Sequence, residues 1–229
     1  MQIEILGDGA FNSCLVHLNP GETFTSESGA LFRSSSNVDV DVTTRSRGQG
    51  GIFSGLKRML SAESFFLSTY SILDGSPGEV GLAPVLQGEL RAVGVTPEVA
   101  WMCAGGSWLG SSEGLTVDTR FQGFKGLFTG ESLSYLHLSG TGTMLVSAFG
   151  RLTEVEVDGA LTVDTGHVVA FQESLSYRLT KAGGSWIHAW LGGEGIVMEF
   201  EGRGKLLVQS HNAKEFGSSL GRLLPPREA

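Results

Sequence analysis

Cysteine, proline and long apolar runs are all scarce in this sequence. Only two cysteines, Cys14 and Cys103, and six prolines occur in 229 residues. The cysteines lie in no zinc-binding spacing and are too few for a disulfide framework, which favours a reducing compartment. No run approaches the ~20 apolar residues of a membrane-spanning helix, and the N-terminus lacks the basic start and apolar core of a signal peptide. We therefore expect a cytoplasmic protein with no membrane partner.

The short motifs of several enzyme classes are also absent. No serine satisfies Gly-x-Ser-x-Gly, and no phosphate-binding loop occurs. Gly202 and Gly204 flank Arg203, but the third glycine of a dinucleotide fingerprint is missing. The sequence thus predicts no nucleotide cofactor, and we expect no cofactor of any other kind.

The five histidines form no metal-binding pattern. None belongs to a His-x-His pair or follows a glutamate at Glu-x-x-His spacing, so most are expected on the surface or in the core. His167 and His188 are the best candidates for ligands, because two histidines could meet across a sandwich. They leave a metal-dependent enzyme open as an alternative.

Positive charge is scarce as well. The formal net charge is −8 and the pI is near 5.1, which disfavours nonspecific attraction to nucleic acid or anionic lipid. The one basic cluster is interleaved with glycines, as in a nucleic-acid-binding loop; its members are Arg45, Arg47, Lys57 and Arg58. We favour a solvated surface loop, so nucleic acid is an unlikely partner.

Glycine is abundant, at 34 residues, and it marks an internal repetition. Residues 51–88, 123–150 and 193–210 share a glutamate preceded by a small residue, an apolar run and a glycine turn. The glutamates lie 68 and 63 residues apart, and the turn glycines 64 and 62; they are Glu63, Glu131 and Glu194, with Gly78, Gly142 and Gly204. A period this long in a chain of strands predicts a duplicated domain. We place the three units at residues 1–85, 86–152 and 153–229, fused into one globular body.

The repeated glutamates have two interpretations. They could serve acid–base chemistry, since they recur. A carboxylate retained in each unit more often accepts hydrogen bonds from backbone amides at a bend, so we favour a structural role for Glu63, Glu131 and Glu194. No catalytic residue is predicted.

Short strands separated by turns are expected along the whole chain. Val38, Val40 and Val42 alternate with aspartates, which predicts a strand with its valines toward the core. Short helices are predicted over residues 55–60 and over residues 212–224, where Phe216 and Leu220 share one face. The predicted fold is all-β, with three tandem antiparallel β-sandwich repeats and one or two short helices.

Several ordered segments resemble one known family. They are PGE at 20–22, ESGA at 27–30, GIFSGLKRMLSAESFF at 51–66, LFTGE at 127–131, SGTG at 139–142, VDTGHVVA at 163–170 and GEG at 193–195. Together they resemble the mitochondrial-biogenesis (altered inheritance of mitochondria) family, whose bacterial members are stand-alone chains. The resemblance implies three joined sandwiches similar to the subunit of TRAP, the tryptophan RNA-binding attenuation protein, in a chain that tends to oligomerise. It implies no established activity and no catalytic residues.

Three hypotheses for function follow. The first is a non-enzymatic cytoplasmic scaffold or binding protein that self-assembles, most simply as a trimer, because sandwiches in line leave open sheet edges at both ends. The second is an RNA- or small-ligand-binding ring analogous to TRAP, which would use the basic cluster. The third is a metal-dependent β-sandwich enzyme, which would use His167, His188 or the repeated glutamates.

Overall fold

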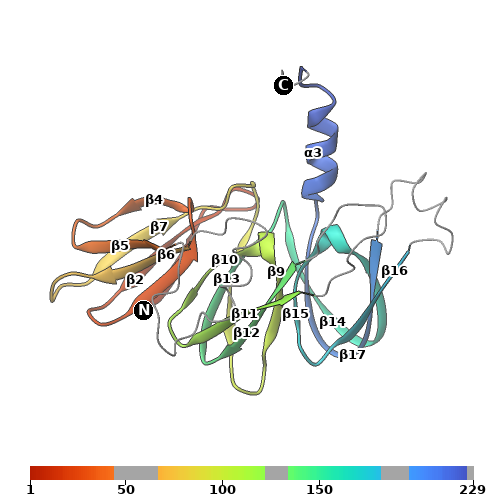
Figure 1. Ribbon diagram of the computed structural model, residues 1–229, viewed down its shortest axis with the longest axis horizontal. Coiled ribbons are helices and arrows are strands. Elements are labelled where there is room, and N and C mark those ends of the chain that lie inside the picture. The colour runs from red at the N-terminus through yellow and green to blue at the C-terminus, as the bar shows by residue number, and fades with distance from the viewer. Residues whose placement is uncertain (44–66, 122–133, 182–195, 226–229) are drawn as a thin grey trace.

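Antiparallel strands make up most of the chain in the computed structural model, which describes residues 1–43, 67–121, 134–181 and 196–225 (Figure 1). The expected all-β class is confirmed. Three groups of strands follow one another along the long axis, with residues 13–82 at one end, 90–147 in the middle and 152–209 at the other end (Figure 1). We call these groups unit 1, unit 2 and unit 3. The predicted division at 85/86 and 152/153 stays a prediction.

Unit 1 is preceded by one additional strand and consists of six strands. The bounds are β1 (Gln2–Leu6), then β2 (Ser13–Leu18), β3 (Thr23–Glu27), β4 (Leu31–Ser34), β5 (Val38–Thr43), β6 (Leu67–Ile72) and β7 (Gly78–Leu82). One sheet has the order β1-β2-β7-β4, while β5-β6-β3 begin a second sheet that continues into unit 2. The first core lies between them and contains Phe24, Tyr70 and Val80.

Unit 2 has the same succession of strands. The bounds are β8 (Leu90–Val95), β9 (Trp101–Ala104), a 3-10 turn (Gly105–Ser107), β10 (Trp108–Ser112), β11 (Leu115–Phe121), β12 (Ser134–Gly140) and β13 (Gly142–Ser147). Strands β10-β13-β8 complete the sheet begun by unit 1, and β11-β12-β9 begin a sheet that continues into unit 3. The second core contains Trp101, Trp108 and Leu136.

Unit 3 merges pairs of strands into longer ones. The bounds are β14 (Leu152–Asp164), a 3-10 turn (Thr165–His167), β15 (Val168–Gln172), β16 (Ser176–Lys181), β17 (Ile196–Gln209) and the helix α3 (Ala213–Gly221). Gly159 and Gly202 lie opposite each other on β14 and β17, with φ of 115° and 119°. These backbone angles suit glycine and let both strands bend around the third core, which contains Phe171 and Phe200.

Two details differ from the sequence-based expectations. Gly204, predicted to lie in a turn with Gly202, lies inside β17, because the strand bends at Gly202 and continues without a break. On β5 the valines are not equally covered: Val38 is 8% exposed, Val40 is half-buried and Val42 is 54% exposed. The inward face of this strand therefore contacts the first core at Val38 and Val40, and Val42 is exposed.

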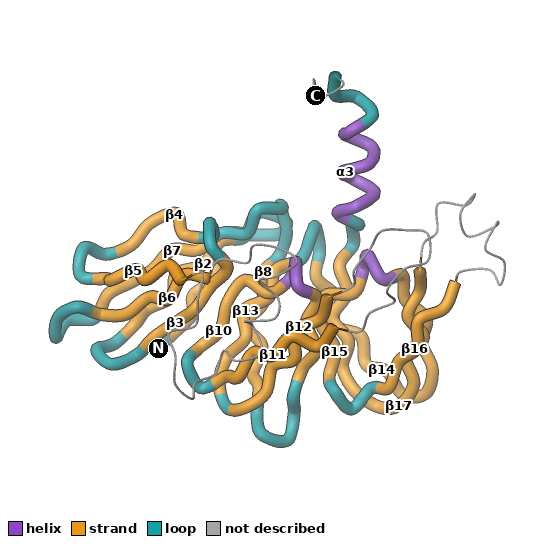
Figure 2. The backbone as a smooth tube through the Cα atoms, in the orientation of Figure 1, coloured by secondary structure: helices purple, strands orange, loops and turns teal. Residues whose placement is uncertain are grey.

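Helix α3 was predicted from the apolar spacing at the C-terminus. Asn212 caps its first turn by accepting hydrogen bonds from the amides of Lys214 and Glu215. The helix extends away from the sheets (Figure 2), although Phe216 packs edge-on against Phe149 with ring centroids 5.3 Å apart. The other predicted helix, at residues 55–60, lies outside the described residues.

Candidate functional site: two open sheet edges

The units are joined to each other by pairing of sheet edges. In the first joint β10 of unit 2 pairs with β3 of unit 1, so that Gly110, Ser111 and Ser112 lie opposite Ser26, Thr25 and Phe24. The second joint repeats this arrangement between β15 of unit 3 and β9 of unit 2, where Ala170, Phe171 and Gln172 lie opposite Cys103, Met102 and Trp101. The two halves of β14 correspond to the first two strands of the other units, so β15 counts as the third strand of unit 3. Each joint therefore pairs the third strand of one unit with the second strand of the unit before it.

Strand β4 is the third strand of unit 1. Within the described part of the chain it pairs with β7 alone, and it carries the same irregularity between its first and third residues as β10 and β15. All four of its residues are exposed, whereas β10 and β15 are buried along nearly their whole length. We call Leu31–Ser34 the open β4 edge.

The contrast is sharpest at the first two positions of these strands. Leu31 is 37% exposed and Phe32 is 49% exposed. The corresponding exposed fractions are 2% and 0% for Trp108 and Leu109, and likewise for Val168 and Val169. Apolar residues at the same positions are thus covered in units 2 and 3 and exposed in unit 1.

The second half of β14, residues 160–164, has the other kind of unpaired edge, the kind to which a third strand pairs in the two joints. It corresponds to β3 and β9, but within the described residues it pairs only with β17. Thr162 is exposed, and Leu161 and Val163 are half-buried against the third core. Their counterparts on β9 are almost fully buried, with Trp101 4%, Met102 5% and Cys103 0% exposed. We call residues 160–164 the open β14 edge.

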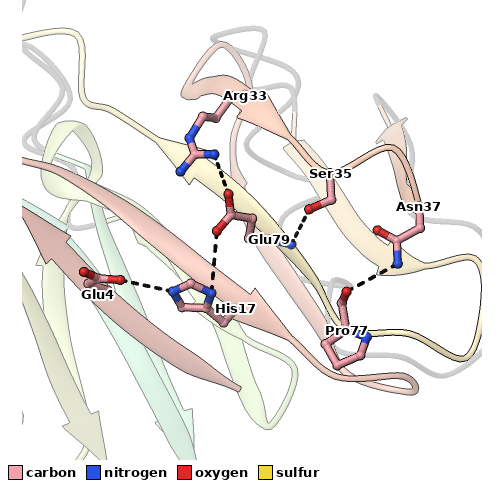
Figure 3. A network of polar contacts seen from close by, with 7 residues as sticks. All are labelled: Glu4, His17, Arg33, Ser35, Asn37, Pro77 and Glu79. Carbon is pink, nitrogen blue, oxygen red and sulfur yellow. Dashed lines mark hydrogen bonds and ion pairs between the residues drawn. The ribbon is translucent and has the colours of Figure 1, made fainter.

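A polar network crosses the outer face of the sheet that ends at β4 (Figure 3). Glu79 on β7 pairs with Arg33 of the open β4 edge, and its other carboxylate oxygen lies 3.8 Å from Nδ1 of His17. Nε2 of His17 lies 3.3 Å from Oε2 of Glu4 on β1. The network thus links all four strands of this sheet and keeps a charged side chain on its exposed edge, where charge opposes indiscriminate strand pairing.

The repeated glycines occupy matching, tightly packed positions. The residue after each glycine donates its amide to a side chain at the end of the third strand: Glu79 to Ser35 Oγ at 3.0 Å, Thr143 to Ser112 Oγ at 2.9 Å and Lys205 to Gln172 Oε1 at 2.9 Å. A Cβ at Gly78, Gly142 or Gly204 would lie 2.8, 2.3 or 2.6 Å from a neighbouring side-chain oxygen. These distances supply a packing reason for glycine at each position.

Most of the other predicted site residues lie outside the described residues. These are Glu63, Glu131, Glu194, His188 and the basic cluster Arg45, Arg47, Lys57 and Arg58. His167 is described: its Nδ1 lies 2.8 Å from the carbonyl oxygen of Gln209, and the Gln209 side chain donates to the carbonyl oxygen of Gly166. His167 therefore contacts the backbone of β17 near the end of the strand, shortly before α3.

Several ionisable groups have altered environments. Burial raises the pKa of Glu27, at the end of β3, to about 7. Burial also raises the pKa of the Cys14 thiol to about 11 and raises that of Cys103, and neither cysteine is bonded.

In the second joint, His137 Nε2 lies 3.2 Å from Oε2 of Glu173 in the next unit. No group of three His, Cys, Asp or Glu side chains within the described ranges is arranged to hold a metal ion.

Sequence analysis alone did not single out the residues of the two open edges. Leu31, Phe32 and Leu161 resemble ordinary core residues in the sequence, since apolar residues also stand at the matching buried positions. Their exposure depends on which unit has a neighbour. Among the described residues, no helix has the length and apolar character needed to cross a membrane.

Comparison with known proteins agrees with the resemblance drawn from the sequence. The family model described as "Mitochondrial biogenesis AIM24" matches residues 3–211. An uncharacterized protein of Streptococcus pyogenes serotype M6 is 29% identical over 216 residues, which cover 92% of this chain and 86% of that protein. The crystal structure of protein SPYM3_0169 from Streptococcus pyogenes superimposes with a TM-score of 0.81 at 26% identity, covering 97% of this chain and 99% of the other. The chain belongs to the AIM24 mitochondrial-biogenesis family.

Proposed function

We propose that this protein is a non-enzymatic, homo-oligomeric scaffold or binding protein of the cytoplasm. One observation carries the proposal: the chain joins its own units by edge pairing, and among the described residues the same two kinds of edge are open on unit 1 and on unit 3. An open edge presents unpaired backbone donors and acceptors, and a second chain can satisfy them.

Head-to-tail pairing of identical chains forms a ring if the rotation between neighbours closes. Three copies are the simplest closed form that we propose. A scaffold of this kind would act by presenting nine similar sandwich units, three from each chain, at fixed spacing. A further observation fits the proposed location: both buried cysteines are unbonded, as in a reducing compartment.

The proposal is tested by light scattering of the full chain after size exclusion. We expect one species at about 73 kDa, three times the 24.2 kDa of the chain. A monodisperse mass of 24.2 kDa at micromolar concentration would contradict self-assembly.

A further inference from the structure

We propose that the open β4 edge of one copy pairs antiparallel with the open β14 edge of a second copy, and that Phe32 completes the second copy's third core. This inference rests on the proposed self-assembly and names the surfaces and the register that bring it about. The occupant of each edge is a second copy of this chain.

The register follows from the two joints within the chain. The third residues of β10 and β15, Gly110 and Ala170, lie opposite the second-to-last residues of β3 and β9, Ser26 and Cys103. The matching residues of the open edges are Arg33 on β4 and Val163 on β14. Pairing in the same register places Ser34 opposite Thr162 of the second copy, because neighbours in antiparallel strands run in opposite directions.

Each core in the chain is completed by the unit that follows it. The first core takes in Leu109 and Leu145 of unit 2, and the second core takes in Val169 and Leu207 of unit 3. The third core takes in side chains of units 2 and 3 only, as far as the described residues go, and Leu161 and Val163 at its rim are half-buried. The third core therefore lacks the apolar side chains that a neighbouring unit supplies to the first and second cores.

Unit 1 supplies a single large side chain of this kind. Phe32 stands where Leu109 and Val169 stand in the other units. Gly81 stands where they have Leu145 and Leu207, three residues after the repeated glycine. A Cβ at Gly81 would lie 2.7 Å from Cζ of Phe32, so the phenylalanine ring occupies the room that the second leucine would take. Unit 1 thus has a large apolar side chain at this position, but in its own chain Phe32 is 49% exposed.

Position 33 differs in size from its counterparts in both joints. Ala170 stands there in the second joint, and in the first joint a Cβ at Gly110 would lie 2.5 Å from Cε1 of Phe24 and 2.7 Å from the backbone oxygen of Thr25. Arg33 pairs with Glu79 on β7, so its side chain reaches over its own sheet and not toward the strand that would pair with β4.

A disulfide test measures the register directly. The double variant Ser34→Cys/Thr162→Cys should form disulfides between copies on mild oxidation, because paired strands bring the two Cα atoms within about 7 Å. The matched control is Ser34→Cys/Glu156→Cys, whose second cysteine lies about 20 Å away from residue 162 measured along the same strand, beyond the bend at Gly159. The unmodified chain should remain uncrosslinked, since Cys14 and Cys103 are both 0% exposed.

A second pair of variants tests the contribution of Phe32. Phe32→Asp should weaken self-association at least about tenfold, because a carboxylate would enter an apolar core. Val85→Asp, between β7 and β8 at a site 85% exposed, should leave it unchanged.

The outcomes separate this inference from the proposed function. The proposed pairing between copies is supported if Ser34→Cys/Thr162→Cys crosslinks and Ser34→Cys/Glu156→Cys does not. It is supported further if Phe32→Asp dissociates the assembly and Val85→Asp does not. An assembled wild-type chain in which neither cysteine pair crosslinks, or both crosslink equally, overturns the joint and leaves self-assembly standing. A monomeric wild-type chain overturns both.

Discussion

Gly88 lies where unit 2 meets unit 3, and its replacement by alanine should strongly destabilise the fold. A Cβ at Gly88 would lie 1.6 Å from the backbone oxygen of Ala148 and 2.8 Å from the backbone nitrogen of Gly150. The obstacle is backbone, so no side-chain rotation can relieve it. The strands at the junction must separate instead.

The separation would cost hydrogen bonds as well as packing. The amide of Glu89 donates to Gly150 O at 2.9 Å, and the amide of Ala148 donates to Glu89 O at 3.0 Å. Overpacking typically costs about 1–3 kcal/mol, and losing both bonds adds about 2 kcal/mol. A total near 4 kcal/mol lowers the melting temperature of a chain of this size by roughly 10 °C.

The matched control is Gly94→Ala on β8, where an added Cβ meets nothing within 4 Å. Removing a glycine from a strand interior should leave stability unchanged or raise it by up to about 1 kcal/mol. Both variants would be compared by thermal unfolding followed by circular dichroism. Melting temperatures within about 2 °C of each other would refute the account of this junction.

Three further predictions concern individual side chains. Burial raises the folded-state pKa of Glu27 from 4.5 to about 7, so its stabilising effect is full below pH 4.5 and is lost as the pH rises through about 7. Glu27→Gln should therefore raise the melting temperature at pH 8 more than at pH 5. An equal effect at both pH values would count against this account of Glu27. Ser112→Ala leaves the Thr143 amide without its acceptor and should lower the free energy of unfolding by about 1–3 kcal/mol in urea titration, whereas an unchanged midpoint would show that the bond contributes nothing. Cys14 and Cys103 should resist alkylation until the chain unfolds, because burial raises the pKa of both thiols; rapid labelling of the native protein would contradict their burial.

The sequence predicted the fold class and several elements because these depend on local pattern. Alternation and turn glycines identified the strands, and the spacing of Phe216 and Leu220 after Asn212 identified α3. The break expected at Gly204 was wrong because a glycine that permits a turn also permits a bend within one long strand, as at Gly202.

The open edges could not be predicted in this way. Phe32 and Leu109 are both large apolar residues at matching positions, and both are of the kind expected in a core. One is 49% exposed and the other 0% because only one has a preceding unit beside it. Exposure at these positions is a property of tertiary arrangement, which local pattern does not encode.

Hydrogen exchange of the backbone amides in the native protein tests the pairing of the two edges most directly. If a neighbouring copy covers both edges, the amides of Leu31–Ser34 and of residues 160–164 that face away from β7 and β17 should exchange as slowly as those of Trp108–Ser112. The Phe32→Asp variant should lose protection at both edges and keep it at β10. Rapid exchange at both open edges in the wild-type protein would contradict the central claim that a second copy pairs with them.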